Sequence, residues 1–351
     1  MKRRDFIHHS LAASVALSTY PSWSLPKAPK REKSIAAYYL RAGMFTQNPD
    51  NLKRDLDLMQ KWGTDTLCIS MHYMQLKRAL LNTDRIAEET RKRGMQFFII
   101  PARVAGLTAA SPIVSFFTAY HPEALSLKKD GTPHLRRNQG PIGSFYHPKT
   151  KEYVQEFVLE IIDKWDVDGL IWDEPKCTWW QDFSPLALEN NSSGNFRKYM
   201  QDMAEFFSKI NLAIKAKKQD CTIVHFDEAV RRIEVVEESA KITPMDYFGC
   251  DGKPWPITFP KSNPKGTPKN LFKNGQRYLK QARSNQTGTM YLVENFNLDQ
   301  EKNDLLERYL PEVINMDIDM LGYYFYGSGL TEPKQTMKIT AKNLKKFKQK
   351  K

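Results

Sequence analysis

Carboxylates stand at the ends of apolar segments in this chain of 351 residues. The clearest case is the run Trp165–Pro175, in which a buried-type strand ends in two adjacent acids, Asp173 and Glu174. Asp251 and Glu294 end later segments of the same kind. Acids beside a buried segment cost free energy unless they are hydrogen-bonded or face a polar pocket. Carboxyl groups brought together at one site can act as general acid, general base or nucleophile, so these four residues are the predicted catalytic group.

Other polar and aromatic side chains end or follow the same segments. Aromatic planes can pack on the apolar faces of a ligand, and polar side chains can hold its polar groups. The residues that we expect to bind substrate are Tyr39, His72, Arg103, Trp179, Trp180, His225, Trp255, Tyr324 and Tyr326. Lys176 is a further candidate for binding an acidic sugar.

The elements that must position these residues alternate along the chain. Short apolar runs of strand type occur at 35–40, 66–70, 96–101, 169–173, 222–226, 246–250, 289–294 and 321–326. Helical periodicity follows them at 51–62, 83–93, 149–165, 194–217, 227–240, 270–285, 300–315 and 334–351. In the fifth of these helices, Asp227 is expected to cap the N-terminus. Strands alternating with helices in this way predict a parallel sheet.

Eight strand–helix units predict a single α/β domain with the (β/α)8 TIM-barrel fold and long βα loops. A doubly wound open sheet is the structural alternative. It is disfavoured because no Gly-x-Gly-x-x-Gly and no phosphate-binding Gly-x-x-x-x-Gly-Lys-Ser/Thr occurs in the sequence. In a TIM barrel the active site lies at the C-terminal ends of the strands, where the four acids fall. We expect the barrel over residues 34–333 and a lysine-rich closing helix or tail over 334–351.

The segment Asp168–Asp173 resembles the fourth strand of glycoside-hydrolase TIM barrels, in which "Asp-Gly-aliphatic-x-x-Asp" delivers a catalytic acid. Upstream, His121–Glu123, Lys128–Thr132 and Phe145–Pro148 also resemble the loop that precedes that strand in those proteins. The resemblance extends over about residues 34–330 as architecture, and its specific motifs lie within about 120–175. It implies a glycosidase acting on an oligosaccharide or polysaccharide, by paired-carboxylate chemistry of the retaining type, without a cofactor or a metal.

Two assignments of the catalytic pair follow from the resemblance. In the first, which resembles the α-galactosidase-like clan, Asp173 is the nucleophile and Asp251 the acid/base. In the second, which resembles the retaining clan with an Asn-Glu-Pro motif, Glu174 is the acid and Glu294 the nucleophile. Asp173 stands where that motif has Asn, which favours the first assignment. Carboxyl separations of about 5–5.5 Å support retention, and about 6.5–9.5 Å support inversion.

Two other classes of function remain open. A non-catalytic carbohydrate-binding barrel would keep the aromatic residues without needing the acids. A metal-dependent hydrolase would draw ligands from His72, His225, Asp173 and Asp251, but no His-x-His or His-Glu-x-x-His motif supports it. Cys177 and Cys250 both lie close to acids at strand ends, and a disulfide between them is a further possibility.

The net charge of +13 comes from the two ends of the chain. Residues 1–33 carry a basic excess, residues 334–351 hold lysines and no acid, and residues 34–333 are formally neutral. A neutral body argues against nucleic acid as a partner. Arg3-Arg4-Asp5-Phe6-Ile7 resembles a twin-arginine export signal and is followed by a modest apolar stretch. We therefore expect an export signal at 1–24, a linker at 25–33, and a periplasmic or extracellular protein with no membrane-spanning segment.

Overall fold

Parallel strands close into a barrel in the computed structural model, which describes residues 31–40, 48–110, 113–136, 139–229, 231–257, 271–324, 326 and 331–350. The order around the ring is β1-β10-β9-β8-β7-β6-β3-β2. The barrel strands are β1 (Ser34–Leu40), β2 (Thr66–Met71), β3 (Gln96–Pro101), β6 (Gly169–Asp173), β7 (Thr222–Glu228), β8 (Tyr247–Gly252), β9 (Gly288–Glu294) and β10 (Met320–Tyr324). The predicted (β/α)8 barrel is confirmed. The predicted export signal and most of the linker lie outside the described residues.

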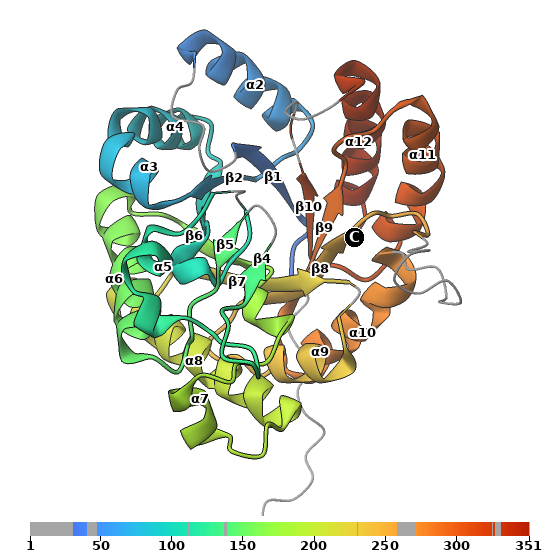
Figure 1. Ribbon diagram of the computed structural model, residues 1–351. Helices are drawn as coiled ribbons and strands as arrows, with labels where there is room; N and C mark the ends of the chain where they lie inside the picture. Colours follow the sequence, from blue (N-terminus) through green and yellow to red (C-terminus); the bar gives the residue numbers. More distant parts are fainter. Residues whose placement is uncertain are drawn as a thin grey trace, which may run out of the picture. The chain divides into compact units, whose positions relative to one another are not determined.

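Helices surround the ring of strands (Figure 1). They are α2 (Pro49–Lys61), α4 (Leu80–Lys92), α6 (Pro148–Trp165), α8 (Phe196–Lys217), α9 (Ile233–Ser239), α10 (Leu271–Ser284), α11 (Gln300–Ile314) and α12 (Pro333–Lys348). Several begin at side chains that accept backbone N–H groups, such as Asn48 before α2 and Asp299 before α11. Among the described residues, no helix has both the length and the apolar character needed to cross a bilayer.

Smaller elements occupy the loops. They are the helices α3 (Tyr73–Arg78), α5 (Phe116–Tyr120) and α7 (Pro185–Asn190) and a hairpin of β4 (Leu135–Arg136) and β5 (Gly140–Pro141). The prediction of a helix over 227–240 is wrong at its start. Strand β7 continues through Asp227 to Glu228, and α9 begins only at Ile233, so Asp227 is not a helix cap.

Side-chain alternation along the strands divides the core into two parts. The lumen of the barrel is filled by one set, which includes Tyr38, Phe98, Ile171, Phe226 and Leu292. The neighbours of these residues in sequence point outward and pack under the helices. Cys177, in the turn after β6, and Cys250, on β8, belong to this helix-facing part of the core. All four cysteines of the chain are free and buried, so the disulfide considered between Cys177 and Cys250 is not formed.

Four aspartates tie the strands together at the N-terminal end of the barrel. Each stands directly before a strand, and its carboxylate accepts the backbone N–H of a residue on the preceding strand of the ring. The pairs are Asp65 with Ile35, Asp168 with Phe97, Asp246 with Ile223 and Asp319 with Thr289, each at 2.8 Å. The backbone carbonyl of each aspartate then accepts from the next strand, at Gln96, Thr222, Gly288 and Ser34 respectively. All eight strands are thereby linked in one ring of hydrogen bonds, a recurrence that the sequence analysis did not detect.

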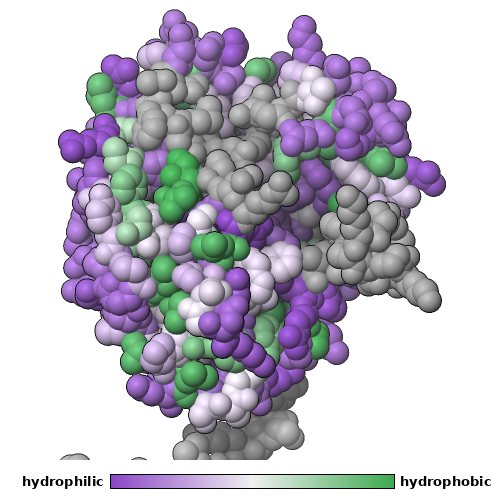
Figure 2. All heavy atoms as spheres, viewed as in Figure 1, coloured by the Kyte–Doolittle hydropathy of each residue, from purple (hydrophilic) through white to green (hydrophobic). Residues whose placement is uncertain are grey.

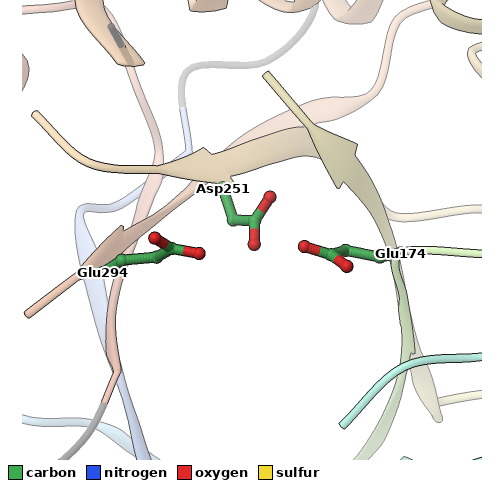
Figure 3. A group of neighbouring side chains, drawn as sticks. All are labelled: Glu174, Asp251 and Glu294. Atoms are coloured by element: carbon green, nitrogen blue, oxygen red, sulfur yellow. The ribbon is translucent and has the colours of Figure 1, made fainter. Parts of the chain in front are cut away.

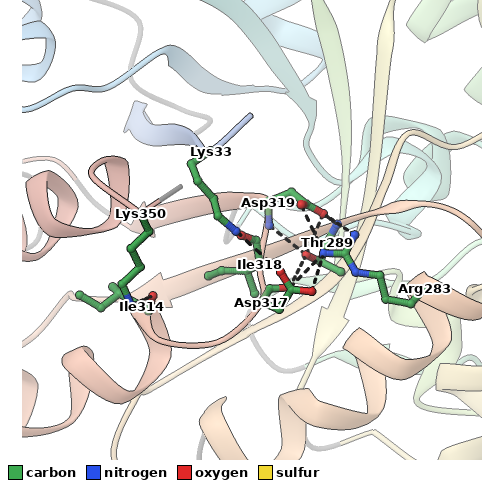
Figure 4. A network of polar contacts seen from close by, with 8 residues as sticks. All are labelled: Lys33, Arg283, Thr289, Ile314, Asp317, Ile318, Asp319 and Lys350. Carbon is green, nitrogen blue, oxygen red and sulfur yellow. Dashed lines mark hydrogen bonds and ion pairs between the residues drawn. The ribbon is translucent and has the colours of Figure 1, made fainter. Parts of the chain in front are cut away.

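Asp319 is the most buried of the four, and Figure 4 shows its surroundings. Its carboxylate accepts the Thr289 N–H at 2.8 Å and an Arg283 guanidinium N–H at 2.9 Å. The Thr289 hydroxyl accepts the Asp319 N–H at 2.9 Å. The neighbouring Asp317 also contacts Arg283, at 3.1 Å, but its side chain is 78% exposed.

We predict that Asp319→Ala lowers the free energy of unfolding by about 2–3 kcal/mol, because it leaves the buried Thr289 N–H without its acceptor and removes one of the two carboxylates that contact Arg283. Asp317→Ala is the matched control and should change it by less than about 0.5 kcal/mol, since the lost ion pair is exposed. Urea unfolding of both variants measures the difference. Equal losses in the two variants would contradict a special role for the buried aspartate.

Candidate active site

The four predicted catalytic carboxylates line one pocket at the C-terminal end of the barrel. Its volume is about 140 Å³. The lining residues are Ala109, Ala110, Arg136, Gln139, Asp173, Glu174, Lys176, Asp251, Leu292, Glu294, Phe296 and Tyr324. The sequence analysis therefore correctly predicted that side chains from the ends of three separate strands, β6, β8 and β9, lie together.

Register and alternation aim these acids inward. Ile171 and Leu292 lie in the lumen, so Asp173 and Glu294, two residues further along β6 and β9, point the same way. Asp251 pairs in register with Leu292 and with Glu228 of β7. Asp173 and Asp251 are each only 5% exposed.

Glu174 reaches the pocket by a different route. It follows β6 in a left-handed backbone conformation, with φ at 41°. A residue with a Cβ pays a conformational cost there, which the surroundings must offset. The Glu174 N–H donates to the Phe226 carbonyl at 3.0 Å, and the Lys176 N–H donates to the Leu107 carbonyl, which holds the turn in place.

Three of the four acids form a tight triad. One carboxylate oxygen from each of Glu174, Asp251 and Glu294 can be chosen so that all three lie within 4.8 Å of one another. Figure 3 shows the three carboxyl groups pointing toward one another across the pocket. Asp173 lies beside this triad and does not belong to it.

Two lysines compensate the charge of the triad. Lys176, 1% exposed, forms an ion pair with Glu174 and a longer one of 3.8 Å with Glu228. Lys253 lies 3.8 Å from Glu294 and donates to two backbone carbonyls, those of Glu294 and Phe296. Buried charges without such partners would be strongly unfavourable.

The pKa values of the carboxyl groups are driven apart. Burial, together with the neighbouring Glu174 charge, raises the pKa of Asp173 to about 8. Burial and the charges of Glu174 and Glu294 raise the pKa of Asp251 well above its usual range. Burial also opposes ionisation of Glu174, but the Lys176 charge and hydrogen bonds from Asp251 and Lys176 outweigh it and lower the pKa of Glu174 to about 2. The site thus holds an ionised Glu174 against a protonated Asp251, the division that acid and nucleophile roles require.

Arg103, predicted to bind substrate, lies buried behind the pocket. Its guanidinium donates to the carbonyls of Thr108 at 3.2 Å and Gln139 at 2.8 Å. It thereby fastens the β4–β5 hairpin, which carries Arg136 and Gln139 into the pocket lining. Burial lowers the pKa of Arg103 to about 10.

Of the other predicted substrate-binding residues, Tyr324 alone lines the pocket, where its ring meets Tyr38 edge-on. His225 is fully buried on the outer side of β7, against Phe207 of α8, because the residue after it, Phe226, faces the lumen. His72 caps α3 and accepts the Met74 N–H at 2.9 Å. The metal-ligand set proposed from His72, His225, Asp173 and Asp251 is therefore not assembled at this pocket.

The three tryptophans and the other two tyrosines that we expected to bind substrate do not line the pocket. Trp179 is 41% exposed and stacks beneath Arg231, with the guanidinium carbon 3.7 Å from the ring centroid. Trp180 stacks on His134, and Trp255 is buried. Tyr39 and Tyr326 face a separate groove between α2 and α12.

The sequence analysis did not assign four residues that take part in this site. Arg136, Gln139 and Phe296 come from loops without a periodic pattern, so no sequence signal pointed to them. Glu228 was placed in a predicted helix. Side chains two residues apart on a strand face the same side, so continuing strand β7 from the inward Phe226 to Glu228 would have directed Glu228 toward the pocket.

No family model matches the chain, and no curated protein matches it. Similar solved structures include the catalytic domain of a β-amylase from Paenibacillus polymyxa, with 6% identity, a TM-score of 0.62 and coverage of 91% of this chain and 100% of that one. An endo-1,4-β-mannanase from Rhizomucor miehei has 11% identity, a TM-score of 0.53 and coverage of 94% and 99%. An α-galactosidase from Lactobacillus brevis has 13% identity, a TM-score of 0.54 and coverage of 92% and 41%.

These identities establish a shared fold and nothing finer. This chain spans about two fifths of the length of the α-galactosidase that it resembles. The barrel is thus of a kind found in glycoside hydrolases, which agrees with the resemblance noted in the sequence.

The raised pKa of Asp173 predicts a pH-dependent stability. Between the usual pKa of about 4 and its folded value of about 8, the folded chain binds a proton that the unfolded chain lacks. The free energy of unfolding therefore falls as the pH rises through this window. Asp173→Asn removes this contribution. The difference in the free energy of unfolding, variant minus parent, should therefore be more positive at pH 8 than at pH 5.

Urea unfolding at the two pH values measures this difference. Asp220→Asn, whose carboxylate is exposed, is the control and should follow the parent at both. If the stability of Asp173→Asn depended on pH as that of the parent does, the assignment of the raised pKa to Asp173 would be refuted.

Proposed function

We propose that the chain is a retaining glycoside hydrolase with Glu174 as nucleophile and Asp251 as acid/base. The observation that carries the proposal is the pairing of an ionised Glu174 with a protonated Asp251 in one pocket, their selected oxygens within 4.8 Å. Retention needs about 5–5.5 Å between the carboxyl groups, whereas inversion needs about 6.5–9.5 Å to admit a water. The limit of 4.8 Å between the selected oxygens of Glu174 and Asp251 lies below the range for inversion, which favours retention of the two mechanisms.

The assignment combines parts of the two sequence-based alternatives. It keeps Asp251 as acid/base from the first and replaces Asp173 by its neighbour Glu174. Asp173 is less suited to act as nucleophile, because its raised pKa keeps it protonated at neutral pH. Glu294 is less suited as well, since burial and Glu174 raise its pKa despite Lys253.

The reaction proceeds in two steps. Asp251 gives its proton to the glycosidic oxygen while the Glu174 carboxylate attacks the anomeric carbon, so the C–O bond to the leaving group breaks and a glycosyl ester forms. Asp251, now ionised, then takes a proton from a water molecule that attacks the same carbon and releases Glu174. Lys176 stabilises the ionised Glu174 before attack and after release.

The proposal includes an oligosaccharide or polysaccharide as substrate and export of the protein. Export is supported by the Arg3–Ile7 motif and the apolar stretch behind it. Two aromatic residues, Tyr324 and Phe296, line the pocket, which supports a carbohydrate substrate.

A panel of aryl glycosides tests the proposal. We predict that Asp251→Asn and Glu174→Gln each lower kcat/KM by about 10²–10⁴-fold on the substrate that the parent hydrolyses, because each removes one reacting group. Asp220→Asn, at an exposed position, should retain parental activity. Parental activity in Asp251→Asn would contradict the assignment. Absence of turnover with binding retained would favour the non-catalytic carbohydrate-binding barrel.

A divalent cation in the carboxylate triad is the second candidate. It is favoured by the mutual approach of Glu174, Asp251 and Glu294 and by the Asp251 oxygen Oδ1, which lacks a hydrogen-bond partner among the described residues. Carboxylate oxygens suit Mg²⁺, Ca²⁺ or Mn²⁺. The ion pairs of Lys176 and Lys253 to the same acids argue against it. Activity lost in EDTA and restored by one of these ions would select the metal-dependent hydrolase, and EDTA-resistant activity would select the paired-carboxylate mechanism.

A further inference from the structure

A second hollow, larger than the carboxylate pocket, lies between the first and last helices of the barrel. Its volume is about 990 Å³. Helices α2 and α12, which form its walls, flank β1 and β10 (Figure 1). The lining residues are Tyr39, Leu40, Arg54, Asp55, Leu58, Trp62, Tyr326, Pro333, Lys334, Met337, Lys338, Ala341, Lys342 and Lys345, and we call this hollow the α2–α12 groove.

The floor of the α2–α12 groove is aromatic. The rings of Trp62 and Tyr326 lie 5.7 Å apart between centroids, and those of Tyr39 and Tyr326 lie 6.0 Å apart. Both tyrosine hydroxyls donate to Asp55, at 3.1 Å from Tyr39 and 3.4 Å from Tyr326. Because Asp55 also pairs with Arg54, at 3.3 Å, the one acid of the lining is already engaged.

One wall of the groove is strongly basic. Lys334, Lys338, Lys342 and Lys345 line it from α12. Spacings of three and four residues keep these lysines on one face of the helix, and four residues correspond to a rise of about 6 Å. Figure 2 shows a largely hydrophilic surface over α11 and α12.

The lysines of α12 divide into two sets. Lys342 pairs with Glu307 at 3.2 Å, and Lys348 pairs with Asp65 at 2.8 Å. For Lys334, Lys338 and Lys345, no carboxylate of the described residues lies within ion-pair distance. Within the described part of the chain, three of the four groove lysines are therefore available to pair with an anionic ligand.

We propose that the α2–α12 groove binds an acidic polysaccharide, a chain of uronate sugars, as an anchoring site separate from the carboxylate pocket. This rests on the proposed function in taking a glycan as the substrate. The half-buried Trp62 ring, backed by the buried Tyr39 and Tyr326, suits the C–H face of a sugar, and a row of lysines suits a chain with a carboxylate on repeated units. An acidic peptide would use the lysines equally well but has no comparable need of an aromatic floor.

Two adjacent residues of β1 face the barrel lumen and the groove. Tyr38 faces the barrel lumen, and its neighbour Tyr39 faces the α2–α12 groove. The groove reaches the C-terminal end of the barrel at Leu40 and Pro333, the end at which the carboxylate pocket opens. A long chain held along the groove would therefore be kept near the catalytic end of the molecule.

Native affinity electrophoresis tests the anchoring site directly. The full chain carrying Asp251→Asn, which prevents turnover, is run in gels containing polygalacturonate, dextran or polyglutamate. We expect strong retardation by polygalacturonate, with little by dextran and polyglutamate. The double substitution Lys338→Glu/Lys345→Glu should weaken binding to polygalacturonate by about tenfold or more, because two charge contacts become repulsive.

Lys346→Glu is the matched control. Lys346 is exposed on the same helix, and its substitution makes the charge change of one of the two groove substitutions, but it does not line the groove. Its binding should stay within about twofold of the parent, since exposed charges beyond the contact are screened. Thermal unfolding midpoints of the three proteins establish that the substituted residues, all exposed, leave the fold intact.

Three outcomes would overturn the anchoring site: equal retardation by polygalacturonate and dextran, equal weakening by Lys346→Glu, or binding to polyglutamate as tight as to polygalacturonate. Aryl-glycoside turnover by the Lys338→Glu/Lys345→Glu chain with Asp251 intact separates the two proposals. Turnover of an aryl glycoside by the parent, with no retardation of the Asp251→Asn chain by polygalacturonate, overturns the anchoring site alone. Retardation by polygalacturonate without turnover by any chain overturns the proposed function alone.

Discussion

The fixed register of the closed barrel is the constraint on which the site depends. A slip of one residue would turn the inward side chains of a strand toward the helices and would remove its carboxylate from the pocket. The four aspartates at the N-terminal end, Asp65, Asp168, Asp246 and Asp319, hold that register by joining all eight strands. Stability and chemistry are therefore placed at opposite ends of the barrel, with one set of acids ordering backbone and the other facing a pocket.

Electrostatic compensation is the second requirement. Acids crowd the pocket, and Lys176 is the buried cation that contacts two of them, Glu174 and Glu228. Its charge acts unequally: Glu174 becomes easier to ionise, while burial keeps Asp173 and Asp251 protonated. A set of chemically similar groups is thereby divided into one ionised carboxylate and protonated neighbours. The left-handed turn at Glu174 contributes to this division, because it brings the carboxylate to Lys176 and Asp251 at once.

Much of this arrangement could be predicted from the sequence, and the failures have physical causes. The barrel and the inward acids Asp173, Asp251 and Glu294 followed from apolar runs whose ends coincide with strand ends. His225 was misplaced because its position relative to Phe226, which decides the face, was not used. Arg103 looked like a substrate ligand, yet its guanidinium holds the β4–β5 hairpin through backbone carbonyls that no pattern reveals. The α2–α12 groove was also invisible, because the lysines of the last helix resemble any solvated face until the structure separates paired from unpaired ones.

The central claim is that Glu174 forms the covalent intermediate with Asp251 opposite it. Fluorosugars of the 2-deoxy-2-fluoro type, with a good leaving group, slow the second step more than formation of the ester and so trap it. A panel of such sugars, chosen to match the aryl glycosides that the parent hydrolyses, would be followed by peptide mass spectrometry. The account predicts one added glycosyl group, on the peptide that contains Glu174, and none in Glu174→Gln. A label on Asp173 or Glu294, or no label from a sugar whose glycoside is hydrolysed, would contradict it.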